Sequence, residues 1–243
     1  MTGPDEAKLR RDLAAAYRLV ALFGWDDHVA THLSARLPDG TFLLNPFGMM
    51  FDEITASQLI RVDMHGNVVS PRDAPLNIAG YTVHSGVLST RPDVNSAMHL
   101  HTHEGVAVSA QKQGLLPLNQ TALLIYSDLA YHDFEGVVSR GDERERLGRD
   151  LGSKNLLLLR NHGTLAVGET IADAFYRIYT LEWCCTTQVR ALADGVELEL
   201  PSREVIAQLG SIMNWSSPDR FSLRNFWPAM LRKAKRECPG FAD

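Results

Sequence analysis

The chain has 243 residues, of which 45% are hydrophobic and 22% charged, as in soluble globular proteins with a substantial core. Its formal net charge of −5 is mild, so the composition does not suggest nucleic acid or an anionic membrane surface as a partner. No segment approaches the roughly eighteen uninterrupted apolar residues of a transmembrane helix, so we also expect no membrane-spanning part.

The first half of the chain alternates between helical and strand-like patterns. Apolar residues three or four positions apart predict an amphipathic helix over residues 5–23, which ends at Gly24. Apolar runs separated by turn residues predict two β-hairpins, and a second helix is expected to stop before a proline. The hairpin strands and this helix are placed at 29–37, 41–45, 59–63, 68–69 and 79–88.

Histidines occupy every second position of the segment that follows. If this segment is a β-strand, His99, His101 and His103 project from one face, while Met98 and Leu100 point into the core. A solvated strand face is the simpler interpretation of a single histidine, but three histidines in register favour a metal site. The segment therefore predicts metal ligands.

The second half contains the clearest buried strand. Thr102 is expected to cap a helix over 104–112, and a charged helix is predicted over 142–151. The continuous apolar run at 156–159 suits a buried strand. A tight, glycine-containing turn after it carries His162, which could meet the imidazoles of a neighbouring strand, although a histidine simply packed in the turn is as compatible.

A long helix is predicted over 171–192, and it contains two of the three cysteines. Cys184 and Cys185 are neighbours in this helix and point about 100° apart, so they do not form a zinc knuckle. With Cys238 the cysteines make an odd number, which favours a reducing compartment. We therefore expect a cytoplasmic protein.

The whole chain, residues 1–243, is expected to form a single domain. Its C-terminal tail, residues 212–243, is predicted to be loop-rich or helical and to lie at a subunit interface. The reason is a set of aromatic residues, which are commoner at subunit contacts than on a bare surface. They are Trp215, Phe226 and Trp227.

Eight short motifs, spread over nearly the whole chain, together resemble a known family. They are LFGW at 22–25, THLSAR at 31–36, LNPFG at 44–48, AGYTVHS at 79–85, RPDV at 91–94, HLHT at 99–102, AYHD at 130–133 and RNHG at 160–163. With these motifs the chain resembles the class II aldolase/adducin family, in its adducin-head-like bacterial branch. The resemblance implies an α/β fold, with three α/β/α layers around a mixed, largely antiparallel sheet, and tetramers with active sites between subunits.

The resemblance also implies a metal centre. In the aldolases and sugar-phosphate epimerases of the family, a divalent ion is bound by an H-x-H pair and by the histidine of a later N-H-G turn. The matching residues are His99, His101 and His162, while His103 is a possible additional contact. Three imidazoles leave one coordination position of the ion open for a carbonyl or hydroxyl oxygen of the substrate, and the ion then acts as a Lewis acid that stabilises an enediolate. Zinc is expected as the cofactor, with manganese or iron as alternatives.

Two positions depart from the aldolase pattern. The true aldolases carry an acidic proton donor and acceptor a few positions before the histidine that matches His84, whereas this chain has Ala79 and Gly80 there. Small hydroxyl and glycine residues hold the substrate phosphate of aldolases, whereas Phe47 stands in this chain and cannot donate a hydrogen bond. We therefore expect a small, unphosphorylated carbonyl or hydroxy-acid substrate.

Another group must then move the proton. Glu104, directly after the ligand strand, and Tyr131 are our catalytic candidates, although a helix-dipole partner and a buried structural hydroxyl are the plainer interpretations. His103 or a metal-bound hydroxide would come next. The predicted substrate-binding residues are His32, Asn45, Gly48 and Gln120.

Three functions remain open on the sequence. A metal-dependent, aldolase-like lyase is favoured. A non-heme iron(II) oxygenase on the same fold is weaker, because the usual iron triad is two histidines and a carboxylate. A non-catalytic adducin-like module, of the actin-associated cytoskeletal type, is the third. The favoured function implies a small-molecule substrate and a homotetramer, with no nucleic acid or membrane partner.

Overall fold

One mixed β-sheet forms the centre of this computed structural model, which describes residues 6–136, 143–195, 197–209 and 217–243. The strand order is β4-β3-β2-β1-β5-β8-β7-β6, and only β6 and β7 pair in parallel. The predicted mixed, largely antiparallel sheet is thereby confirmed. The strands are β1 His32–Arg36, β2 Phe42–Leu44, β3 Ile60–Val62, β4 Val68–Ser70, β5 Ser96–Leu100, β6 Leu129–His132, β7 Leu156–Leu159 and β8 Gly163–Gly168.

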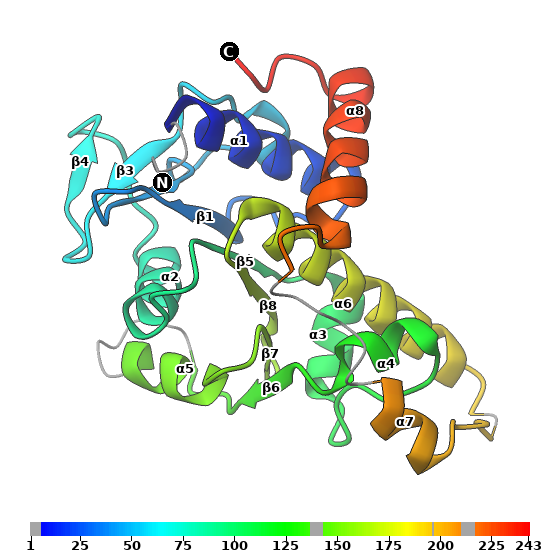
Figure 1. The fold of residues 1–243 in the computed structure, drawn as a ribbon. Coiled ribbons are helices and arrows are strands. Elements are labelled where there is room, and N and C mark those ends of the chain that lie inside the picture. The colour runs from blue at the N-terminus through cyan, green and yellow to red at the C-terminus, as the bar shows by residue number, and fades with distance from the viewer. Residues whose placement is uncertain (1–5, 137–142, 196, 210–216) are drawn as a thin grey trace.

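Helices cover both faces of the sheet, which confirms the three layers (Figure 1). One face carries α1 Glu6–Leu22, α3 His103–Ala110, α4 Gln120–Tyr126, α6 Ile171–Leu192 and α8 Trp227–Glu237. The other carries α2 Ile78–Thr90 and α5 Glu143–Leu151. Shorter helices are the 3₁₀ turn Phe51–Glu53, α7 Arg203–Leu209 and the π-helical turn Ser222–Phe226. None of the helices in the described ranges combines the length and apolarity needed to cross a membrane.

The strands divide the apolar side chains between the two faces. In β5, Met98 and Leu100 join the cluster under α1 and α6, whereas Ala97 joins the cluster under α2 and α5. Strand β7 is four consecutive leucines because both of its faces are covered. Each buried leucine contributes roughly 1.5–3 kcal/mol to folding. The alternation of β5 also turns His99 towards the α2 face, away from Met98 and Leu100.

Most predicted elements form close to their predicted bounds, and the long helix 171–192 is unchanged as α6. Strand β1 begins at His32 and not at residue 29, because the preceding residues form a turn in which His28 has φ 48°. Strand β5 ends at Leu100, so the prediction that His103 continues the row of histidines is wrong. Helices α4 and α7 and strands β6 and β8 were not predicted from the sequence.

The tail is largely helical where it is described, but the two described aromatic residues on which the interface was predicted are buried. Phe226 and Trp227 are 9% and 5% exposed, and both pack against Phe175 of α6, with ring centroids 6.2 and 5.4 Å away. Trp215 lies outside the described residues. The prediction of a subunit interface at 212–243 therefore loses the exposure on which it was based and stays a prediction.

A buried ion pair joins the segment before α8 to α6. Arg220 donates from Nε to Oδ1 and from Nη2 to Oδ2 of Asp173, both at 2.6 Å, and Ser222 donates to Oδ1 at 2.6 Å. The two charged side chains are 7% and 1% exposed. Such a bidentate pair fixes geometry as well as charge.

We expect Arg220→Ala to destabilise the fold by about 3–5 kcal/mol, because Asp173 would be left as an uncompensated buried charge. Arg224→Ala is the matched control, since Arg224 and its partner Asp219 are 65% and 71% exposed and should contribute at most about 1 kcal/mol. Urea unfolding of both variants measures the difference. Equal losses of unfolding free energy in the two variants would contradict a stabilising role of the buried Arg220–Asp173 pair.

Candidate functional site

Three imidazoles converge where β5 ends and β8 begins. His99 is the fourth residue of β5, His101 follows the strand, and His162 lies in the turn before β8. Nε2 of His99 lies 2.8 Å from Nε2 of His101 and 3.2 Å from Nε2 of His162. They are the one group among the described residues that is arranged to hold a metal ion.

In two of these rings the Nδ1 atom, on the side away from the cluster, has a hydrogen-bond partner. Nδ1 of His99 donates to the backbone carbonyl of Thr164 at 2.8 Å, and Nδ1 of His101 lies 3.1 Å from the Asp27 carboxylate. Because neutral imidazole carries one N–H, these contacts leave the Nε2 atoms unprotonated and pointing inwards. A carbonyl or carboxylate behind a histidine is the usual way in which proteins orient a metal ligand.

The surroundings favour neutral rings. Burial, together with the nearby His162, His101 and His32, holds the pKa of His99 well below its usual range. Burial and the neighbouring His101 and His132 lower the pKa of His162 to about 4. Neutral imidazole is the form that binds a metal.

The donor set fits a divalent ion. In a tetrahedral site with Zn–N bonds of about 2.0–2.1 Å, two ligand nitrogens lie about 3.3 Å apart. The Nε2 atom of His99 lies 3.2 and 2.8 Å from those of His162 and His101, and the ligand atoms of all three residues lie within 4.8 Å of one another. Three histidines and an open fourth position are the ligand pattern of catalytic zinc.

Two cavities meet at these imidazoles, and their linings differ. The first, which we name the apolar cavity, has a volume of about 360 Å³ and includes His32, Phe47, Ala79, Val83 and Phe134 in its wall. The second, which we name the acidic cavity, has a volume of about 340 Å³. It is lined by Asp26, Asp27, His103 and Glu104 among others. His101 and His162 line both cavities.

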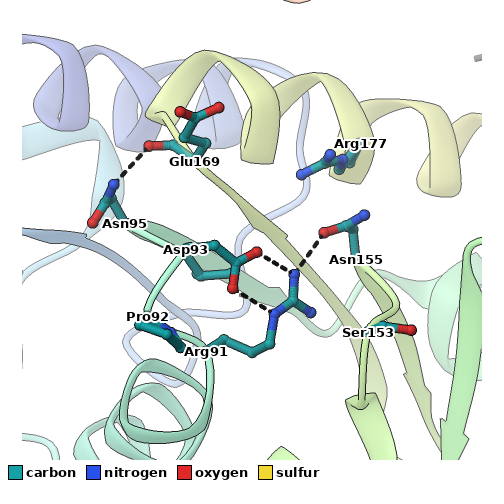
Figure 2. Close-up of a pocket in the computed structure, with 9 residues that line it drawn as sticks. Arg91, Pro92, Asp93, Asn95, Ser153, Asn155, Glu169 and Arg177 are labelled. Carbon is teal, nitrogen blue, oxygen red and sulfur yellow. Dashed lines mark hydrogen bonds and ion pairs between the residues drawn. The ribbon is translucent and has the colours of Figure 1, made fainter. Parts of the chain in front are cut away.

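A larger cavity, of about 660 Å³, lies at the opposite end of β5 (Figure 2). Its charged side chains already have hydrogen-bond or ion-pair partners. Arg91 binds the Asp93 carboxylate at 2.8 and 2.7 Å and the Asn155 side chain at 3.2 Å. Arg177 donates to the backbone carbonyl of Val167 at 2.5 Å. The converging imidazoles, not this larger cavity, therefore form the candidate functional site.

A second histidine pair lies behind the apolar cavity. Nδ1 of His32 lies 2.8 Å from Nε2 of His84, and Nδ1 of His84 lies 2.7 Å from Oγ of Ser34. All three residues are buried, and burial lowers the pKa of His84 to about 3. His32 and Ser34 can reach the same helix because alternate residues of β1 face α2.

Known proteins resemble nearly the whole chain. The sequence model described as the class II aldolase and adducin N-terminal domain matches residues 11–189. The chain belongs to the class II aldolase/adducin family. A Caulobacter vibrioides protein, provisionally named as a class 2 aldolase, is 50% identical over 98% of this chain and 93% of its own length. Mouse alpha-adducin is 43% identical over 78% of this chain, which covers 26% of that protein.

Solved structures of the family have the same fold. An aldolase II superfamily protein from Pseudomonas syringae is 43% identical, has a TM-score of 0.93, and is matched over 100% of this chain and 98% of its own. L-fuculose 1-phosphate aldolase from Glaciozyma antarctica is 28% identical, with a TM-score of 0.83 over 96% of this chain and 92% of its own. The family thus includes both named aldolases and adducins.

The two predicted catalytic residues lie in different places. Glu104, in the first turn of α3, lines the acidic cavity beside His101 and His162. Tyr131 lines neither cavity at the imidazoles: its hydroxyl accepts a hydrogen bond from the Leu115 amide at 3.2 Å. Burial raises the pKa of Tyr131. Within this chain, Glu104 is therefore the better placed of the two.

The predicted substrate-binding residues are also scattered. Only His32 lines the apolar cavity. Asn45 is buried, and its Oδ1 accepts a hydrogen bond from the Tyr17 hydroxyl at 2.8 Å. Gly48, with φ +95°, shapes the turn after Phe47, and Gln120 is exposed at the start of α4. Their roles in substrate binding stay predictions.

Sequence reasoning missed the residues behind the ligands. Glu182, in the middle of α6, is 1% exposed and accepts hydrogen bonds from the hydroxyls of Thr102 and Thr164. Burial raises its pKa to about 7. Thr102 also caps α3 by accepting from the Gly105 amide at 2.9 Å, so one carboxylate braces both chain segments that carry the imidazoles. A glutamate in the middle of a long and largely apolar helix was the available signal.

We expect Asp27→Ala to weaken divalent-metal affinity by about 10–100-fold, because His101 would lose the group that orients it. Asp26→Ala is the matched control: Asp26 lines the same acidic cavity, and its variant should bind metal like the wild type. Competition with a chelating dye measures both affinities. Equal weakening would show a general charge effect instead.

We expect stability to fall as pH falls from about 6.5 towards 3, because unfolded His84 takes up a proton that its buried folded form resists. His84→Gln should flatten the wild-type slope by up to about 1.4 kcal/mol per pH unit between these values. Urea unfolding at several pH values, without metal, tests this. His65→Gln, at an exposed turn, should leave the slope unchanged. If His84→Gln keeps the wild-type slope, His84 is not the source of the pH dependence.

Proposed function

We propose that this protein is a divalent-metal-dependent lyase that acts on a small, unphosphorylated carbonyl or hydroxy-acid compound. The observation that carries the proposal is the convergence of three imidazoles, two of which, His99 and His101, are oriented from behind by Thr164 and Asp27. A divalent ion held there, zinc in preference to manganese or iron, would supply Lewis-acid polarisation of a substrate oxygen.

The lining of the apolar cavity supports a substrate that carries no phosphate group. The described residues in its wall include no lysine or arginine, and Phe47 and Phe134, 45% and 56% exposed, supply aromatic surface there. A phosphate dianion would lack the charged partners that usually bind it. A compound with an apolar or uncharged substituent suits this wall.

The acidic cavity offers carboxyl groups that could exchange a proton with the substrate. Glu104 and Asp26 line it beside His101 and His162, and Glu104 is the proposed acid–base candidate on this side. Tyr131 would need to reach the substrate of another subunit, which fits the proposed homotetramer with sites between subunits. We propose a cytoplasmic location, with no nucleic acid or membrane partner.

Two other functions compete with the lyase. An adducin-like, non-catalytic module is favoured by the 43% identity to mouse alpha-adducin. An iron(II) oxygenase is less well supported, because the nearest carboxylate, Asp27, contacts the outer Nδ1 of His101 and not the inner side of the cluster. Metal-dependent turnover without oxygen would distinguish the lyase from both.

We expect the purified protein to bind one divalent ion per chain and His101→Ala to lose it, because two imidazoles would remain. His103→Ala should keep the ion, since His103 is exposed on α3 outside the cluster. At 100 times the dissociation constant, metal should stabilise the wild type by about 2.7 kcal/mol. Elemental analysis and melting curves with zinc, manganese or iron(II) test this. A wild type that neither holds nor responds to any of them would refute the proposal.

The lyase activity is measured separately, under argon and in air, as aldehyde release from unphosphorylated 2-oxo acids that carry a hydroxyl group on the carbon β to the carbonyl. We expect metal-dependent turnover that does not require oxygen. Metal binding without turnover of any member of the panel would favour the adducin-like module.

A further inference from the structure

Exposed apolar side chains gather at the apolar cavity. Among the described residues, six large apolar side chains are at least 45% exposed. Two of them, Phe47 and Phe134, line this cavity, and a third, Ile78, stands in the chain between the lining residues Asn77 and Ala79. Grouped exposed apolar side chains mark binding surfaces, whereas single ones need no explanation. Because the three converging imidazoles line the same cavity, a ligand of that cluster is the occupant that this surface favours.

The backbone around Phe47 is held on both sides. Before it, the buried Asn45 donates from its amide to the Tyr17 hydroxyl at 3.2 Å. The Phe47 amide itself donates to the Pro75 carbonyl at 2.9 Å. Gly48 follows with φ +95°, a left-handed conformation that glycine adopts without strain. The turn that brings Phe47 to the cavity is therefore fixed by hydrogen bonds.

The polar side chains of the cavity wall have other contacts. Oδ1 of Asn77 accepts a hydrogen bond from the Gly80 amide at 3.1 Å and so caps α2. Nδ1 of His32 lies 2.8 Å from His84. The other three imidazoles are the candidate ligands, and the described wall contains no lysine, arginine or carboxylate. A bound molecule therefore meets the ligand cluster on one side and mainly apolar surface elsewhere.

We infer that Phe47 is a specificity-determining residue, and that the substrate carries an alkyl or aryl group that packs against it in the apolar cavity. The inference rests on the proposed lyase function and narrows its substrate class, because the substituent must be apolar and not merely free of phosphate. Phe134 and Val83 belong to the same wall. Since burial of apolar surface is favourable in proportion to its area, a longer apolar group should bind more tightly.

A series of hydroxamic acids tests this without knowledge of the natural substrate. The hydroxamate group chelates zinc and is the same in every member, so only the tail differs. The full-length, zinc-loaded protein is titrated by calorimetry with acetohydroxamate, butyrohydroxamate, hexanohydroxamate and benzohydroxamate. A fifth member, 3-phosphonopropanohydroxamate, carries a phosphonate in place of the terminal methyl of butyrohydroxamate. Elemental analysis after each titration checks that zinc stays bound.

The variants separate Phe47 from other exposed aromatic residues. Phe47→Ala removes its apolar surface, Phe47→Leu keeps much of it, and Phe47→Lys replaces it with a cation. Phe134→Ala removes the other aromatic side chain of the wall. Phe221→Ala is the matched control, because Phe221 is 52% exposed but lies outside the cavity, against the Tyr176 ring. A melting curve accompanies each variant.

We expect wild-type affinity to rise about fourfold for each methylene added between acetohydroxamate and butyrohydroxamate, as burial of a methylene does. The phosphonate tail should bind at least about tenfold more weakly than the butyl tail, because it would lose water without gaining a charged partner. Phe47→Ala should weaken hexanohydroxamate and benzohydroxamate by about tenfold and leave acetohydroxamate within about twofold. Phe47→Leu should recover most of the loss, and Phe47→Lys should reverse the preference between the butyl and phosphonate tails. Phe221→Ala should bind like the wild type.

Other outcomes separate this inference from the lyase function. If the wild type binds all tails within about twofold, or if Phe47→Ala keeps the dependence on the tail, the inference is overturned while the lyase function stands. A loss confined to Phe134→Ala would give the role to Phe134. If Phe47→Ala keeps the tail dependence but lowers the molar mass in light scattering, the exposed side chains form a contact between copies of the chain instead. A zinc-loaded wild type that binds no hydroxamate at all would count against the open metal position, and so against both proposals.

Discussion

The antiparallel pairing of β5 with β1 on one side and β8 on the other is the constraint on which the site depends. It sets His32 opposite His99, and it brings the turn before β8, with His162, to the end of β5. Because side chains alternate along a strand, a slip of one residue would turn His99 into the cluster under α6 and expose Met98 to the α2 face. The leucines, methionine and alanines on both faces therefore hold the imidazoles in register.

The polar groups around the histidines form two layers of hydrogen bonds. The carbonyl of Thr164 orients His99, and the carboxylate of Asp27 orients His101. Behind them Glu182 accepts from two threonine hydroxyls at the junctions of β5 with α3 and of the His162 turn with β8. Buried polar groups that are left unpaired cost stability, so this second layer both supports the fold and fixes the rings. It gives a metal ion a site that needs little rearrangement.

The family contains aldolases and adducins, so membership alone does not decide whether the chain is an enzyme. The decision lies in a few side chains at the end of the sheet. Position 80 is glycine and position 47 is phenylalanine, so these positions supply neither the acidic group nor the phosphate contacts that the resemblance to the aldolases implies, while the three converging histidines are complete. This combination supports the proposed lyase with an unphosphorylated substrate.

The sequence by itself determined the helices α1, α2, α3 and α6 and the buried strand β7, because periodicity and caps are local. The three candidate ligands came from the resemblance of its histidine motifs to those of the family. The sequence did not determine that β5 stops before His101, nor that β6 and β8 complete the sheet, because these short segments become strands only by pairing with neighbours far along the chain. Asp27 lies 74 residues from His101, and His84 lies 52 from His32. Only the tertiary structure decided these contacts, since a hydrogen bond between distant residues has no periodic signature in the sequence.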